Sequence, residues 1–276
     1  MQISDVKMVS SGLRRVMVLI SLLEVIVGPL LYLFPSHTDT LFAWTILPPL
    51  TAMFLGGTYL TALVIVQLSV REKVWANERA IYPGLLLFTI LTLLATLLHL
   101  DRFHFQSPDL IARLTAWAWL IVYIIVPILM VVFMVIQGRL RGTDPQRRTT
   151  LPPGYRLVLF FQSAVMVVLG IALVLIPQLA RSLWPWQLTA LTSAAIAAWL
   201  IGLGVALAQS ALENAWERIR MAVYGPAVMG ALQLVAAVRF APVMNWGGAA
   251  AWLYAFFCLS LLLAGLYGIR QVRSTA

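Results

Sequence analysis

The sequence predicts an all-α integral membrane protein of about eight membrane-spanning helices, arranged as two parallel repeats of four helices. The prediction rests on composition, on the apolar runs, and on the distribution of arginine and lysine. Of the 276 residues, 62% are hydrophobic and 11% are charged, and the mean hydropathy is +0.92. Ordinary soluble domains carry roughly 25% charged residues, because their surface is in contact with water. A bilayer removes that requirement, since each helix satisfies its own backbone hydrogen bonds.

Eight apolar runs have about the length needed to cross a hydrocarbon core of about 30 Å, which takes roughly 20 helical residues. The predicted spans are 14–34, 44–69, 81–100, 112–137, 156–177, 187–209, 219–239 and 249–269. The connections are short except for residues 138–155, which are rich in arginine and proline. We therefore divide the chain into a first four-helix repeat at 1–137, a linker at 138–155, and a second four-helix repeat at 156–276.

The basic residues predict the orientation. The two termini and the even-numbered loops carry all of the 19 Lys and Arg residues except Arg102, Arg113, Arg181 and Arg239. Short loops rich in Lys and Arg stay in the cytoplasm, so we expect both termini and the linker there, in a cell (plasma or inner) membrane. Because these residues sit in short loops, the net charge of +9 does not indicate a nucleic-acid partner. The expected partners are the lipid bilayer, other membrane proteins or further copies of the chain.

Recurring residues indicate an internal duplication. At a constant offset of 142, Arg14, Ser21, Gly28, Pro35 and Trp44 recur as Arg156, Ser163, Gly170, Pro177 and Trp186. Four spans per repeat is an even number, so both copies would insert with the same orientation. The two repeats would then be related by an axis along the membrane normal, as in other parallel-repeat proteins.

Intramembrane polar residues give the first candidate site. Glu24 lies in the middle of the first predicted span, where a charge costs several kcal/mol and often marks function. Its counterpart at the offset of 142 is Met166, so the predicted chemistry belongs to the first repeat. Threonines on neighbouring spans share helix faces at spacings of three and four residues and offer a polar path beside Glu24; they are Thr58, Thr61, Thr89, Thr92 and Thr96. The alternative is that these hydroxyls bond to their own helix backbones or to neighbouring helices.

A Glu-x2-Trp-x3-Arg element occurs once in each half. It reads Glu72, Trp75, Arg79 in the first half and Glu213, Trp216, Arg220 in the second. Its spacing puts the three residues on one helical face, with tryptophan at headgroup depth and arginine toward lipid phosphates. The alternative is a symmetric docking site for a lipid headgroup or a partner. Further tryptophans are expected in the same aromatic belts, namely Trp44, Trp119, Trp184, Trp186 and Trp246.

Histidines and aspartates gather near the predicted outer face of the first half. They are His37, Asp39, His99, Asp101 and His104. Imidazole and carboxylate groups are ligands for divalent metals, and histidine also titrates near neutral pH. The residues therefore define a candidate outer site for a metal, for haem or for pH sensing, although their spacing matches no known ligand motif. The expectation is that no cofactor is bound, with a divalent metal or haem as the alternative.

Three functions follow from these residues. The leading hypothesis is a transporter-like protein that passes an ion or a small solute through the first repeat, with proton or cation exchange at Glu24. The second is a non-catalytic accessory or structural subunit of a larger membrane complex. The third is a metal- or haem-binding redox membrane protein. The sequence has no phosphate-binding loop, nucleophile elbow or paired-histidine zinc helix, so an enzyme is not the expectation.

Overall fold

A computed structural model describes residues 6–275 and is all-helical. Its long helices are α1 (Ser11–Leu33), α3 (Pro49–Arg71), α4 (Tyr82–Leu98), α5 (Leu110–Arg139), α6 (Pro153–Leu175), α8 (Ala190–Glu213), α10 (Tyr224–Arg239) and α11 (Ala249–Thr275). Short helical segments connect them: α2 (Thr38–Leu41), η2 (Trp75–Asn77), η3 (Leu100–Arg102), α7 (Pro177–Ser182), α9 (Trp216–Ile219) and η4 (Ala241–Val243).

Six of the long helices are long and apolar enough to cross a membrane: α1, α3, α5, α6, α8 and α11. The chain is therefore a helical, multi-pass membrane protein by length and composition. The other two predicted spans form shorter helices, 17 residues in α4 and 16 in α10. At 1.5 Å per residue these helices measure about 24–26 Å, because turns replace their predicted ends. Residues 220–223 turn before α10, and α4 gives way to η3 at His99.

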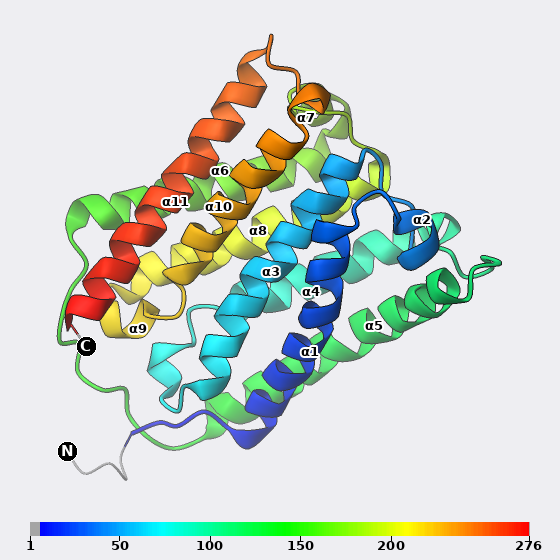
Figure 1. The fold of residues 1–276 in the computed structure, drawn as a ribbon. Coiled ribbons are helices and arrows are strands. Elements are labelled where there is room, and N and C mark those ends of the chain that lie inside the picture. The colour runs from blue at the N-terminus through cyan, green and yellow to red at the C-terminus, as the bar shows by residue number, and fades with distance from the viewer. Residues whose placement is uncertain (1–5, 276) are drawn as a thin grey trace.

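The helices form two layers, each built from both halves of the chain. One layer is α1–α3–α10–α11, which lies in front in Figure 1, and the other is α6–α8–α4–α5 behind it. The edges of the layers meet where α1 contacts α5 and where α11 contacts α6. The two halves therefore do not pack as separate bundles, because α4 lies against α8 and α10 lies against α3.

Helices from different halves of the chain approach each other closely where α4 crosses α8 and where α10 crosses α3. A Cβ atom on Gly84 of α4 would overlap the carbonyl oxygen of Gly202 in α8, so small residues are required at this crossing. The other crossing is held by hydrogen bonds. Gln233 of α10 donates to the Phe54 carbonyl of α3 over 3.0 Å, and beside this crossing the Tyr32 hydroxyl of α1 donates to the Leu232 carbonyl of α10 over 2.9 Å.

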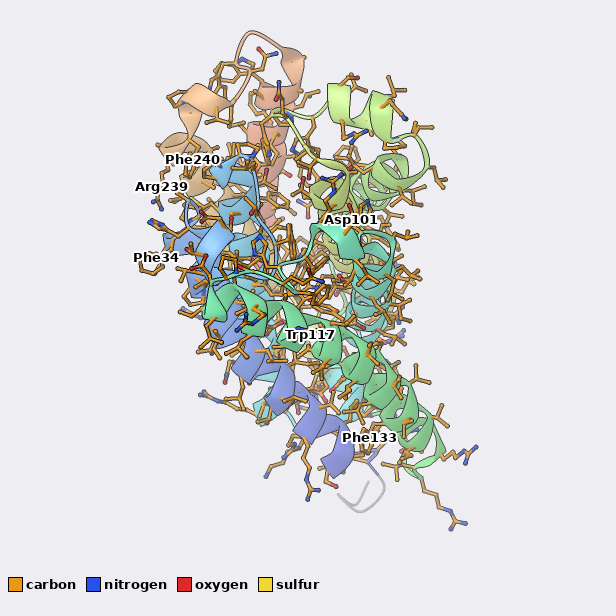
Figure 2. All side chains as sticks on the ribbon, turned by 90° about the vertical axis from the view of Figure 1, so that its right-hand side faces the viewer. Phe34, Asp101, Trp117, Phe133, Arg239 and Phe240 are labelled. Atoms are coloured by element: carbon orange, nitrogen blue, oxygen red, sulfur yellow. The ribbon has the colours of Figure 1, made fainter. Side chains whose placement is uncertain are left out.

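The two ends of the bundle are built from different connections. Residues 6–8 pair with the linker and with the α3–α4 connection, while α9 touches both η2 and α11. We call this the linker end; α1 begins and α11 ends there (Figure 1). The opposite end carries α2 and α7 and is called the α2–α7 end. Figure 2 shows Arg239 and Phe240 beside Phe34 at the α2–α7 end, where Arg239 reaches the Tyr32 carbonyl.

Most of the tryptophans expected in aromatic belts lie inside the protein. Trp44, Trp119, Trp184 and Trp186 are buried. Their rings pack against each other, with centroids 4.9 Å apart for Trp44 and Trp119 and 5.2 Å apart for Trp184 and Trp186. Large aromatic rings fill the space between helix ends, and this burial outweighs their preference for headgroup depth. Trp117 on the outer face of α5 is exposed instead (Figure 2).

Candidate functional site

Glu24 lies on the buried face of α1. Ser21, Glu24, Gly28 and Leu31 are spaced three or four residues apart and are all buried, so this face packs against the bundle. Gly28 lets Leu60 of α3 approach closely. As a result, Glu24 is only 4% exposed, although its neighbours along the helix face outward.

A cavity of about 260 Å³ lies beside Glu24, and we call it the Glu24 cavity. It is enclosed by α1, α4 and α5, with Tyr59 of α3 on its inner wall, and its lining is almost entirely apolar. Ile26 also lines this cavity and is 67% exposed, so the cavity opens sideways on the outer surface of α1. Exposed apolar side chains lie on the outer surfaces of α1 and α5, for example Leu22 and Ile121, as expected of a surface in contact with lipid chains.

The polar groups of the Glu24 cavity are few. Glu24 Oε2 has no hydrogen-bond partner, and the ion pairs found within residues 6–275 do not include Glu24. The hydroxyls of Tyr59 and Tyr123 are 2.6 Å apart and hydrogen-bonded. Tyr59 and Tyr123 line the cavity together with the rings of Phe42 and Trp119. A carboxyl group in such surroundings keeps its proton or needs a cation beside it.

The predicted threonine path is not gathered around Glu24. Of the five threonines, Thr89 alone lines the Glu24 cavity. Hydroxyls donate to carbonyl oxygens of their own helices at 2.6–2.8 Å in Thr58, Thr61, Thr89 and Thr96. Thr96 also accepts a hydrogen bond from Trp119, and Thr92 is buried outside the lining. The threonines therefore serve mainly as internal helix partners, which was the alternative interpretation.

The histidines lie apart and have separate contacts. The ring nitrogens of His104 lie 3.0 Å from Thr45 Oγ1 and 2.9 Å from the Phe42 carbonyl, so this ring ties two connections together. His99 contacts the carbonyl one turn earlier in its own helix. His37 and Asp39 are exposed at α2, and Asp101 pairs with its neighbour Arg102. Within residues 6–275, no three His, Cys, Asp or Glu side chains form a group able to hold a metal ion.

The two Glu-x2-Trp-x3-Arg elements pair with each other across the halves of the chain. Arg79 donates two hydrogen bonds to Glu213, over 2.5 Å and 3.0 Å. In return, Arg220 pairs with Glu72. Each arginine therefore binds the glutamate of the other element. The three residues of each element do not share one helical face, because each element spans a helix end and the short turn after it.

This cluster at the linker end includes further charges. Arg218 donates to Glu213 over 3.0 Å, and Asp144 of the linker lies 2.6 Å from Arg79. Burial raises the pKa of Glu72, but amide hydrogen bonds from Val74 and Lys73 and the Arg220 guanidinium together lower it below 4.5. The arginines thus turn inward to buried carboxylates instead of outward to lipid phosphates, because a buried carboxylate requires a partner.

Glu78 is a further buried carboxyl at the linker end that was not predicted from the sequence. It is 2% exposed and accepts a hydrogen bond from the Tyr82 hydroxyl over 2.9 Å. Its second oxygen has no partner. Burial raises the pKa of Glu78 to about 8, despite the opposing hydrogen bond from Tyr82. The tyrosines of the Glu24 cavity were also missed, because a tyrosine within an apolar run is most often an interfacial residue.

Comparisons with known proteins give no relative for this chain. No family model matches it, and no curated protein and no solved structure shows significant similarity.

Proposed function

We propose that this chain binds a lipophilic organic cation that enters the Glu24 cavity from the bilayer, and that the cation exchanges there with a proton on Glu24. The observation that carries the proposal is an unpaired carboxyl group, 4% exposed, in an apolar cavity that opens on the side of the bundle. The proposal keeps the exchange at Glu24 that the sequence predicted. It replaces the ion or small solute with a molecule that dissolves in lipid.

The charge of the ligand follows from Glu24. An isolated carboxylate in an apolar interior is unstable, and the ion pairs of residues 6–275 leave Glu24 without a cationic side chain. A proton or a bound cation would neutralise it. Aromatic rings bind organic cations on their faces, and the cavity is lined by Phe42, Tyr59, Trp119 and Tyr123.

The apolar character of the ligand follows from the lining and the opening. Water-soluble ions need a polar path, yet the predicted threonines other than Thr89 do not reach the cavity. The lateral opening beside Ile26 faces the lipid side of α1. The volume of about 260 Å³ lies just below the usual range of small-molecule pockets, which begins at roughly 300 Å³, so a larger aromatic cation would extend through the lateral opening toward the lipid.

We further propose that all eight long helices insert, as two related halves with both termini and the linker in the cytoplasm of the cell. Two features support this topology. The linker end gathers the arginine-rich connections, in agreement with the retention of basic loops in the cytoplasm. Equivalent helices also make equivalent contacts, since α1 packs on α3 as α6 packs on α8, and α4 packs on α8 as α10 packs on α3.

Binding of tetraphenylphosphonium to the purified, detergent-solubilised protein tests the ligand proposal. Wild-type protein should bind this cation more tightly as the pH rises, because the proton on Glu24 competes with it. Glu24→Gln should weaken binding by at least roughly tenfold, while Asp101→Asn, which removes an exposed carboxylate, should not. Uncharged triphenylphosphine should bind both proteins alike. Equal tetraphenylphosphonium affinity of Glu24→Gln and wild type would refute the proposal, and absence of binding to both would favour an accessory subunit.

A further inference from the structure

We propose a second binding site, between α6 and α11, for a membrane lipid held by the ester carbonyl of a fatty acyl chain. A cavity of about 440 Å³ lies there, and we call it the Trp184 cavity. It is bounded by α6, α8, α10 and α11, with Phe54 of α3 on its inner wall. Its lining contains no charged side chain.

The chemistry of this cavity differs from that of the Glu24 cavity. Met166 lines it at the position that corresponds to Glu24 by the offset of 142. Gln233 also lines it, but its amide is already engaged: it donates to the Phe54 carbonyl and accepts from the Tyr254 hydroxyl over 3.1 Å. An organic cation would find no anionic partner here.

One polar group of the lining is unpaired. Trp184 is 7% exposed, and its Nε1 atom is buried without a hydrogen-bond partner. An indole N–H donates and cannot accept, so the missing partner is an acceptor such as a carbonyl oxygen. A buried donor left unpaired is destabilising, which favours a ligand that carries an acceptor.

The position of Trp184 fits the ester carbonyl of a lipid. Trp184 follows α7 at the α2–α7 end, where the polar headgroup region adjoins the acyl chains if the helices span the bilayer. From there the cavity follows α11 from Ala250 to Leu261, about 16 Å at 1.5 Å per residue. Val168 and Leu253 line the cavity and are 66% and 67% exposed, so an acyl chain can enter sideways from the lipid.

The chain has a single cysteine, so a unique thiol probe can be placed at the cavity. Cys258 itself is buried and would react too slowly, whereas Leu253 lines the Trp184 cavity and is 67% exposed. In a protein carrying Leu253→Cys and Cys258→Ser, we expect methyl oleate to slow the labelling of the introduced thiol by N-ethylmaleimide in detergent. At equal concentration, 1-octadecene, a hydrocarbon without an acceptor, should protect the thiol from labelling roughly threefold to tenfold less. This factor is the difference in affinity expected from one hydrogen bond.

Two variants separate loss of the Trp184 donor from damage to the cavity. Trp184→Phe should remove the advantage of methyl oleate over 1-octadecene, and the remaining protection by 1-octadecene shows that the cavity is intact. Trp44→Phe is the matched control, because Trp44 also has a buried, unpaired Nε1 atom but does not line this cavity. Equal protection by both compounds in wild type, or an unchanged difference in Trp184→Phe, would overturn the inference. Tetraphenylphosphonium binding at Glu24 should be the same in Trp184→Phe as in wild type, which keeps this test separate from the one above.

Discussion

Substitution of Glu213 by glutamine tests whether the two halves of the chain are joined by exchanged ion pairs. The Glu213 side chain is 4% exposed and binds Arg79 and Arg218. The glutamine carbonyl would still accept one hydrogen bond, but the buried Arg218 would lose its full countercharge and keep only the Pro145 carbonyl and an Asp144 oxygen 3.8 Å away as its other partners. Breaking a buried pair by removing one partner costs about 3–5 kcal/mol, and we expect a loss of stability of this size.

The companion pair should be weaker. Arg220 is 44% exposed, so water screens its pairing with Glu72 and replaces the lost partner. Glu72 also accepts hydrogen bonds from the Lys73 and Val74 amides, which a glutamine carbonyl still satisfies. Glu72→Gln should therefore cost about 1 kcal/mol or less, clearly less than Glu213→Gln.

Double-mutant cycles give the decisive measurement. Unfolding is followed by tryptophan fluorescence in mixed micelles of dodecylmaltoside and increasing sodium dodecyl sulfate. The pair Arg79 and Glu213, from different halves, should show a coupling free energy of about 1–3 kcal/mol. The pair Arg79 and Glu72, from the same half, is the control and should show a coupling below about 0.5 kcal/mol. Greater coupling within the half than across the halves would refute the exchanged arrangement.

Three further predictions concern the packing and the buried polar groups. Burial raises the pKa of Glu78 to about 8 in the folded protein, against an ordinary 4.5. The folded protein therefore binds this proton more tightly than the unfolded chain, and stability falls as the pH rises from about 4.5 to 8. Glu78→Gln should flatten this pH dependence in unfolding curves measured across that range. Gly84→Ala places a methyl group against the Gly202 carbonyl and should lower stability by about 1–3 kcal/mol. Gly154→Ala is the control: a Cβ there meets no atom within 4 Å, so the unfolding midpoint should stay nearly unchanged. His104→Ala removes both ring contacts at the α2–α7 end and should cost about 1–2 kcal/mol; an unfolding midpoint equal to that of wild type would contradict a structural role for the ring.

Local features of the sequence were enough to predict the helices. Apolar runs identified all eight long helices, because a long apolar segment buried away from water satisfies its backbone groups best as a helix. Helix ends were less well predicted: α3 begins at Pro49 instead of residue 44, and α10 begins at Tyr224 instead of residue 219. Turns at these positions depend on tertiary contacts, such as the pairing of Arg220 with Glu72.

Glu24 was identified from the sequence because a carboxyl group inside an apolar run is unusual whatever surrounds it. The tertiary structure decided what surrounds Glu24, namely Tyr59 and Tyr123 from two other helices. It also decided that Trp184 is a buried donor and that Arg79 binds the glutamate of the other half. Hydropathy and helical spacing depend on neighbours along the chain, so the sequence alone determined the apolar helices and their buried acid. Which helices of the two halves lie side by side depends on contacts between residues more than a hundred positions apart, such as Gln233 and Phe54, and only the fold sets those contacts.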